Sequence, residues 1–420
     1  MTGHDAEQPE SRLARRLGTW DAVVIGLGSM IGAGVFAAIG PAAAAAGGGL
    51  LIGLALAAVV AYCNATSSAQ LAALYPASGG TYVYGRKRFG HLWGFLAGWG
   101  FVIGKTASCA AMALTFGSYL DADLARPLGV GAVVALTVVN LRGVQKTAWL
   151  TRVIVAMVLG SLAVVTTAGL ASSPTTANIG PLTEGGWRGI LEAGALLFFA
   201  FAGYARIATL GEEVRDPAHT IPRAIPIALG ITLVVYATVA MVALCAVGPA
   251  ALASSSAPLT TVVDASGWSW TVPVVRIGAA VASLGVLLSL LVGVSRTTFA
   301  MASERDLPRW LDAVHPVHRI PHRAELAVAT IVIAVVLVAD VRGAIGFSSF
   351  AVLFYYAIAN ASAFTLTPTE RRWPRPLAVA GIVGCAGLAL ALPPSSVIGG
   401  TLLLATGAGA WGVRRRTTGS

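Results

Sequence analysis

Residues 19–40 read TWDAVVIGLGSMIGAGVFAAIG, an apolar stretch long enough to cross a bilayer as one helix. A glycine costs a helix about 1 kcal/mol relative to alanine, and it lets the backbone come close to a ligand. Four glycines lie near the middle of this stretch: Gly26, Gly28, Gly32 and Gly34. We expect the helix to be interrupted around Ser29, Met30 and Ile31, where the break either lines a cavity or serves close helix packing.

The whole chain is as apolar as this stretch. Of its 420 residues, 56% are hydrophobic and only 11% are charged, and the mean hydropathy is +0.78. A soluble protein carries roughly 25% charged residues, so a soluble fold is excluded. The first 20 residues are polar and lack the apolar core of a signal peptide. The composition therefore indicates a protein that crosses a membrane several times.

Long uncharged runs recur along the chain, and each favours one membrane-spanning helix. They are uninterrupted, which argues against the alternating segments of a β-barrel. We therefore predict an all-α integral membrane protein with twelve transmembrane helices, at about 20–45, 50–73, 92–120, 127–141, 149–171, 190–210, 224–247, 274–300, 325–340, 343–366, 376–392 and 395–413.

Basic residues gather in alternate connections between these runs. Arg86, Lys87 and Arg88 lie between the second and third runs, and Arg414, Arg415 and Arg416 end the chain. Under the positive-inside rule, both termini are cytoplasmic and the protein lies in the cytoplasmic membrane. The net charge of +10 is thus a signal of topology, and we expect no nucleic-acid partner.

The sequence offers no spacing typical of a metal or redox site. The four cysteines stand singly in apolar runs: Cys63, Cys109, Cys245 and Cys385. Three histidines, His315, His318 and His322, are close in sequence, but prolines interrupt any helix there and nearby arginines disfavour a cation. We expect a solvated loop at the histidines, no metal and no cofactor.

A second interruption is expected in the sixth run. Residues 194–217 read GALLFFAFAGYARIATLGEEVRDP, with three phenylalanines before Gly203 and Tyr204 after it. The first and sixth runs each begin a set of five, so the two breaks occupy corresponding positions. Matched breaks in two halves point to the binding site of a secondary transporter built from an inverted repeat.

The segment after this break reads as a rigid charged elbow. Glu212 and Glu213 follow the helix, where the macrodipole disfavours acids. Asp216 precedes Pro217, and Pro222 is expected to open the next helix at its first turn. We assign this segment to structure or gating.

Three segments together resemble the amino acid–polyamine–organocation transporter superfamily. GSMIGAGVF at 28–36 resembles its broken first helix, and FFAFAGYARIATLGEEVRDPAHTIPRAI at 198–225 resembles its sixth helix and the following loop. SRTTFAMASERDLPRWLDAVHP at 295–316 resembles the end of its eighth helix. The resemblance implies a core of five plus five helices, with broken helices 1 and 6, and two peripheral helices.

The resemblance also implies where a substrate binds. The freed N–H groups of the first break would hold the substrate carboxylate, and carbonyls of the second break would hold its ammonium. Phe199 matches an aromatic gate of relatives, and Tyr204 matches an aromatic that limits the side-chain pocket. The implied substrate-binding residues are Met30, Ile31, Gly32, Ala33, Gly34, Phe199, Ala200, Phe201, Ala202, Gly203 and Tyr204.

Two positions depart from the family pattern. Many relatives carry a lysine in helix 5 where this chain has Val158, whereas here Lys105 lies in the third run. Ionisable groups inside a span are costly, so Lys105 is a candidate for proton coupling or a buried lysine that bonds backbone carbonyls. Arg206 replaces a small residue, and it would contact an anionic substrate group or pair with Glu212. Ser289 and Ser295 are further candidates for coupling or gating.

We expect an amino acid permease that works by alternating access, coupled to protons or to an exchanged amino acid. The alternatives are an integral-membrane enzyme and a channel or sensor. For an enzyme the only candidate cluster is Glu212, Glu213, Asp216 and His219, which lacks a binding motif, and no ring-forming charge pattern supports a channel. The expected organisation is a cytoplasmic tail at 1–19, five-helix repeats at 20–171 and 190–366 with an extracellular loop at 172–189 between them, two peripheral helices at 367–413 and a cytoplasmic tail at 414–420.

Overall fold

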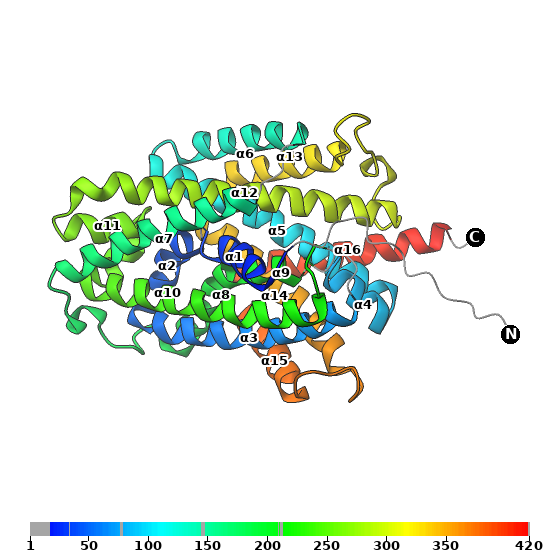
Figure 1. Cartoon of the computed structure of the whole chain (residues 1–420), viewed down its shortest axis with the longest axis horizontal. Helices are drawn as coiled ribbons and strands as arrows, with labels where there is room; N and C mark the ends of the chain where they lie inside the picture. The colour runs from blue at the N-terminus through cyan, green and yellow to red at the C-terminus, as the bar shows by residue number, and fades with distance from the viewer. Residues whose placement is uncertain are drawn as a thin grey trace.

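The computed structural model describes residues 17–32, 34–75, 79–143, 148–208, 210 and 213–418. Within these ranges the chain is helical, and its only extended pairing is an isolated bridge between Leu17 and Val214. The long helices lie side by side along one axis of the molecule (Figure 1). The short helix α4, Thr81–Phe89, lies at one end, which we call the α4 end.

Each predicted apolar run forms one helix or a pair of helices. The first run divides into α1, Thr19–Met30, and α2, Gly34–Ala46. The sixth becomes α8, Gly186–Phe201, followed by a 3₁₀ turn at Ala202–Tyr204 and α9, Ala205–Ala208. The other runs are α3 (Leu50–Leu74), α5 (His91–Leu120), α6 (Ala125–Leu141), α7 (Ala148–Ala171), α10 (Pro217–Ser254), α12 (Val272–Ser303), α13 (His322–Val338), α14 (Val341–Phe364), α15 (Arg375–Ala391) and α16 (Pro394–Thr418), and α11 (Pro258–Ala265) is a short extra helix.

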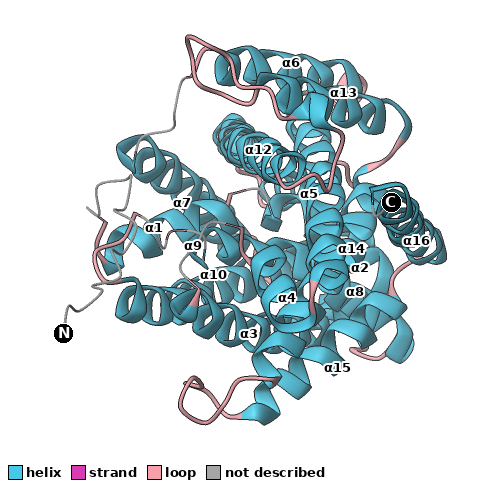
Figure 2. Cartoon of the chain, turned by 90° about the vertical axis from the view of Figure 1, so that its right-hand side faces the viewer, coloured by secondary structure: helices cyan, strands magenta, loops and turns pink. Residues whose placement is uncertain are grey.

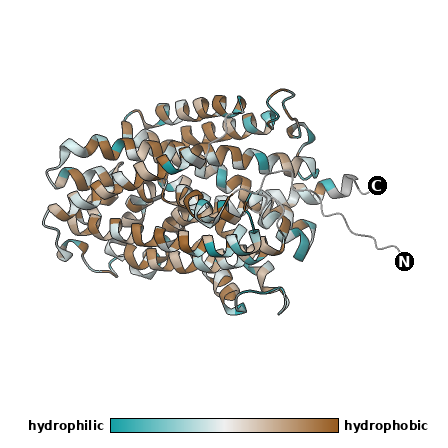
Figure 3. Ribbon diagram, in the orientation of Figure 1, coloured by the Kyte–Doolittle hydropathy of each residue, from teal (hydrophilic) through white to brown (hydrophobic). Residues whose placement is uncertain are grey.

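By length and composition, eight helical stretches among the described residues are able to cross a membrane. α6 and α15 are apolar but shorter, with 17 residues each. Hydrophobic residues cover the middle of the bundle, and hydrophilic ones gather toward its ends (Figure 3). Large apolar side chains such as Val234 and Leu390 face outward. These features suit a multi-pass membrane protein, while the number of twelve crossings stays a prediction.

The helices of the two interrupted runs, α1 with α2 and α8 with α9, lie at the centre of the bundle. α1 packs on α7 and α10, while α2 and α3 pack on α8. α5 packs mainly on α12 and α14. Viewed onto the α4 end, α6 and α13 form an outer pair beyond α12, and α15 and α16 lie on other outer sides (Figure 2). The central position of the breaks shields their free backbone groups from lipid.

The elbow before α10 differs from the expectation in one respect. The helix opens at Pro217 rather than Pro222, after Asp216 in a left-handed conformation with φ of 98°. A proline at the first helical position costs no hydrogen bond, because the backbone N–H at that position has no acceptor within the helix. Pro222 lies inside the helix, and the carbonyl of Ala218, four residues earlier, accepts a hydrogen bond from the Arg372 guanidinium instead.

Candidate substrate site at two broken helices

The first break is abrupt. α1 ends at Met30, and the N–H of Ile31 still donates to the carbonyl of Leu27 at 2.8 Å. α2 starts again at Gly34, while Ala33 lies outside the described residues. A Cβ at Gly32 would lie 2.2 Å from Cγ2 of Val286 on α12, so only glycine fits where the chain passes this helix.

At the second break the α-helix changes to a 3₁₀ turn rather than unwinding directly. α8 ends at Phe201, and the chain continues as a 3₁₀ turn from Ala202 to Tyr204. α9 then adds only four residues, Ala205–Ala208. Mid-helix 3₁₀ stretches often mark a hinge or a strained site, because their hydrogen bonds have poorer geometry.

The two breaks lie directly against each other. A Cβ at Gly203 would lie 2.3 Å from the carbonyl oxygen of Ser29. A Cβ at Gly34 would lie 2.5 Å from the Cβ of Ala200. Small residues at these points therefore let the backbone of α1 and α2 touch that of α8 and the 3₁₀ turn. The structure thus brings Ser29 and Met30 next to Gly203, and Gly34 next to Ala200, whereas Gly32 lies against Val286 of α12.

Two tyrosine hydroxyls hold carbonyls at the breaks. Tyr236 on α10 donates to the carbonyl of Met30 at 2.5 Å, and its hydroxyl lies 3.2 Å from the carbonyl of Ala200. Tyr356 on α14 donates to the carbonyl of Ala202 at 3.4 Å. Tyr236 therefore joins the two breaks through one atom. Sequence analysis missed it, although a tyrosine in the seventh apolar run needs a partner for its hydroxyl when buried.

Aromatic rings pack around this junction. Tyr356 lies edge-on to Phe198, with centroids 5.9 Å apart, and 5.2 Å from the ring of Tyr204. Phe201 meets Tyr236 edge-on at 5.2 Å. These rings are buried, whereas the expected gate residue Phe199 stays partly exposed. Phe199 therefore faces differently from the buried Phe198 and Phe201 beside it.

A polar cavity of about 160 Å³ adjoins the last turn of α1. Arg206 and Glu213 line it with their side chains 43% and 37% exposed, and their nearest N and O atoms are 3.5 Å apart. Glu213 is thus an acid partner of Arg206, while Glu212, the partner expected from the sequence, lies outside the described residues. The complete lining is Leu17, Ile25, Gly28, Ser29, Thr151, Arg206, Glu213 and Ser289.

Not every predicted coupling residue lies at this cavity. Ser289 lines it and donates to the carbonyl of Gly285 at 2.9 Å, but Ser295 is buried and donates to the carbonyl of Val292 at 3.1 Å. Lys105 is 7% exposed on α5, and no hydrogen bond or ion pair of its side chain occurs within the described ranges. It lies outside the cavity lining, because α5 packs on α12 and α14.

A buried acid escaped sequence analysis. Glu325, in the first turn of α13, is buried and accepts a hydrogen bond from the Asn140 amide of α6 at 2.9 Å. The signal was present in the sequence, since an acid and an amide lie at the ends of two predicted spans. This hydrogen bond joins the outer helices α6 and α13, and its donor is a neutral amide rather than a cation.

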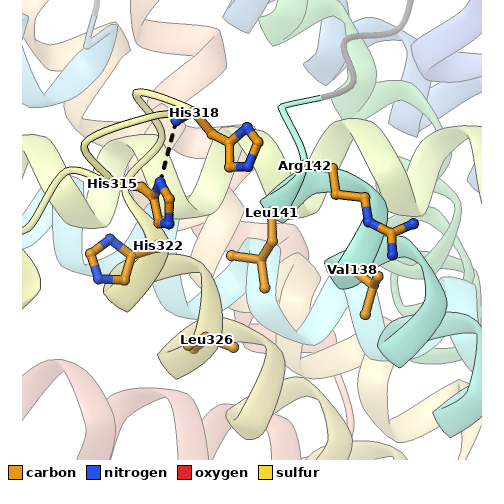
Figure 4. Close-up of a pocket in the computed structure, with 7 residues that line it drawn as sticks. All are labelled: Val138, Leu141, Arg142, His315, His318, His322 and Leu326. Carbon is orange, nitrogen blue, oxygen red and sulfur yellow. Dashed lines mark hydrogen bonds between the residues drawn. The ribbon is translucent and has the colours of Figure 1, made fainter.

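The three histidines lie close together, His315 and His318 in the loop as expected and His322 at the start of a helix. His322 is the first residue of α13, and His315 is partly buried. Together with His318 they line a cavity of about 330 Å³ (Figure 4). Among the described residues, no group of three or more His, Cys, Asp or Glu has an arrangement that would hold a metal ion.

Comparison with known proteins shows the family to which this chain belongs. The profile of a family described as amino acid permease matches residues 17–406. An uncharacterized transporter of Mycobacterium tuberculosis is 62% identical over 417 residues, which cover 99% of this chain and 94% of that protein. Two proteins of Bacillus subtilis are each 28% identical over 76% of this chain and 74% of their own length: a branched-chain amino acid permease and a methylthioribose transporter. The chain is therefore a transporter, and it belongs to the amino acid permease family of the amino acid–polyamine–organocation superfamily.

Proposed function

We propose that the protein moves amino acids across the cytoplasmic membrane by alternating access, with the substrate bound between the two broken helices. The observation that carries the proposal is the backbone contact of Gly203 with Ser29, beside a polar cavity. In this proposal α1 to α14 form two inverted five-helix repeats, α15 and α16 are peripheral, and both termini are cytoplasmic.

The backbone chemistry at the breaks suits a zwitterion. The first N–H groups of α2 have no acceptor within their own helix, and they lie at the positive end of its dipole. This end would hold the carboxylate of the substrate. The carbonyls of Ala200 and Ala202 would accept from the ammonium, because a carbonyl oxygen that already takes a tyrosine hydroxyl has a second lone pair.

Alternating access requires that the junction separates on one side at a time. The cavity beside Ser29 and Arg206 provides a path to one side. Toward the other side, the Tyr119 hydroxyl donates to the carbonyl of Phe36 at 3.1 Å, and the two rings meet edge-on at 5.6 Å. We infer that this aromatic pair closes the route opposite the cavity.

We propose a proton as the coupling ion, with Lys105 as the group that carries it. A lysine buried without a countercharge is costly in a membrane, which argues for a role beyond packing. Arg206, Glu213 and Ser289 would gate the cavity. Glu212, Ser295, Phe199 and Tyr204 remain candidates for gating and for the side-chain pocket.

Uptake of radiolabelled amino acids into proteoliposomes tests the proposal. We expect saturable uptake that is driven by an inward proton gradient and leaves the solute chemically unchanged. Methylthioribose is included as a competitor, because one relative carries that name. Currents without saturation would indicate a channel, and a modified solute would indicate an enzyme. Failure of every amino acid to be taken up or exchanged would overturn the proposal.

The Lys105→Met variant tests the coupling step separately. We expect it to retain exchange of internal for external amino acid but to lose the stimulation by an inward proton gradient. The matched control is Lys87→Met, since Lys87 lies on α4 at the end of the bundle. Unchanged pH dependence of uptake in Lys105→Met would reject Lys105 as the coupling group and leave transport itself untouched.

A further inference from the structure

The outer pair α6 and α13 carries a cavity that transport does not use. It lies between the end of α6 and the start of α13, on the side of the α4 end, where the loop after α12 begins with Glu304 bound to Arg86 of α4 at 2.7 Å. Arg142 and Val138 lie on one side of this cavity and the histidines on the other, with Leu141 between them and Leu326 below (Figure 4). One cavity therefore combines a cationic and imidazole rim with apolar walls.

The polar rim presents hydrogen-bond donors. The Nδ1 atom of His315 accepts from the backbone N–H groups of Val317 and His318, both at 3.3 Å. A ring nitrogen that accepts carries no proton, so the proton of His315 is on Nε2, which can donate to a ligand. His322 Nδ1 is buried and has no hydrogen-bond partner within the described structure. The rim thus offers the His315 imidazole and the Arg142 guanidinium to an acceptor, and the His322 ring packs edge-on against His315 with centroids 5.6 Å apart.

Charge around the cavity favours an anion. Its lining includes Arg142 and no acid, and Arg319 and Arg323 lie in the adjoining segment. Two acids lie three residues along the chain from lining histidines: Glu325 is buried and accepts from Asn140, and the exposed Asp312 accepts from the Ser303 hydroxyl. The described residues that line the cavity do not include a group arranged for a metal ion.

The apolar walls continue onto the outer surface of the helix pair. Val138 and Leu326 line the cavity and are themselves exposed, at 42% and 48%. Val134 is one helical turn from Val138, and Leu337 lies three turns along α13 from Leu326 on nearly the same face. Both are also exposed. In a bilayer these side chains face acyl chains, so an occupant would have a charged head at the rim and an apolar tail on the helices.

We propose that this cavity binds an anionic phospholipid of the surrounding bilayer, with the phosphate at Arg142 and His315 and the acyl chains along α6 and α13. Basic pockets between helices at a membrane surface are suited to such headgroups. A free phosphate would match the rim alone, whereas a phospholipid matches both the rim and the exposed apolar walls. The proposal does not depend on the transported solute.

Native mass spectrometry of the delipidated full-length protein in detergent tests this site. Phosphatidylglycerol is titrated against phosphatidylcholine of identical acyl chains. We expect preferential binding of phosphatidylglycerol, and Arg142→Ala to weaken it about tenfold, since a hydrogen bond to a charged group contributes roughly that factor. Arg223→Ala is the matched control, because Arg223 is an exposed arginine on another helix, α10. This variant should bind phosphatidylglycerol as the unmodified protein does.

His315→Leu provides a second variant that keeps the arginine. It should weaken phosphatidylglycerol binding in the same direction and leave phosphatidylcholine unchanged. Equal binding of the two lipids, or unchanged binding in both Arg142→Ala and His315→Leu, would overturn the proposal. Binding of inorganic phosphate at the rim without any binding of phosphatidylglycerol would overturn it too. All of these are binding measurements, so their failure would leave the transport proposal standing.

Discussion

The centre of the bundle and its α4 end are held together by different chemistry. At the centre, neutral groups meet: the Tyr236 hydroxyl holds the carbonyls of Met30 and Ala200, and Gly203 lies against Ser29. At the α4 end, ion pairs join segments far apart in sequence, such as Arg86 with Glu304 and Arg88 with Glu370.

Desolvation explains this difference. Burying a charge in the low-dielectric centre costs several kcal/mol of desolvation free energy. At the water-exposed end the same charge costs little, and an ion pair there also contributes little to stability. The contacts between the two breaks are therefore made by backbone and hydroxyl groups. We expect substitutions at the centre to affect transport most, and substitutions at the α4 end to affect mainly stability.

The largest effect is expected from Gly203→Ala. The added methyl would lie 2.3 Å from the Ser29 carbonyl oxygen, so the two breaks must move apart. We expect uptake in proteoliposomes to fall to background. The matched control is Gly230→Ala on α10, where an added Cβ meets nothing within 4 Å. Normal uptake by Gly203→Ala would mean that contact between the breaks is not needed for transport.

A smaller effect is expected from Tyr236→Phe, which removes one hydroxyl and keeps the ring. The carbonyls of Met30 and Ala200 then lose a shared donor. We expect uptake about tenfold slower and a free energy of unfolding lower by about 1–2 kcal/mol, as for a lost buried hydrogen bond. Tyr62→Phe on the exposed face of α3 is the control. Equal behaviour of the two variants would remove Tyr236 from the mechanism.

At the α4 end, Tyr82→Phe should act on stability. Tyr82 donates to Asp306 at 2.7 Å, and burial together with this carboxylate raises the pKa of the Tyr82 phenol above its usual value. Asp306 also lies 3.5 Å from His91, so it keeps one partner when the phenol is removed. We expect thermal unfolding to show a loss of about 1 kcal/mol, with uptake changed less than about twofold. A loss of uptake as large as that of Tyr236→Phe would erase the contrast between the two regions.

The smallest effect is expected from Glu370→Gln, and it depends on pH. Hydrogen bonds from the backbone N–H of Thr367 and from Arg88 lower the pKa of Glu370 below its usual value of 4.5. Because the pKa of Glu370 is lower in the folded state, its ionised form stabilises the fold at any pH above the usual pKa of 4.5. This stabilisation is lost as the pH falls through the lowered pKa of the folded state. The variant should therefore unfold at a slightly lower temperature at pH 7, and the difference should vanish in acid. A difference that grows in acid would contradict this sign.

Much of the fold followed from local patterns in the sequence. The apolar runs predicted the positions of the helices within a few residues, except that α10 begins seven residues before the predicted 224 and ends seven residues after the predicted 247. Glycines around Met30 and the phenylalanine–glycine segment before Tyr204 predicted where two helices are interrupted. Such patterns act within one or two helical turns, so the residues nearby decide them.

The partners of these segments were not predictable in the same way. Tyr236 lies 206 residues from Met30 along the chain, and the histidine cavity depends on how α6 packs on α13. The contact of Arg206 with Glu213, seven residues along the chain, depends on how the chain turns after α9. Each of these outcomes is set by the packing of distant segments, which no local spacing records.

The sequence by itself determined that the chain is apolar enough to enter a membrane, where its helices lie and where two of them are weakened, because hydropathy and helix propensity are properties of neighbouring residues. Only the tertiary structure decided that the two weak points touch, that one tyrosine joins them, and that Lys105 lies away from the cavity. The physical reason is that close packing brings together atoms hundreds of residues apart, and the free backbone groups of a broken helix find their partners only there.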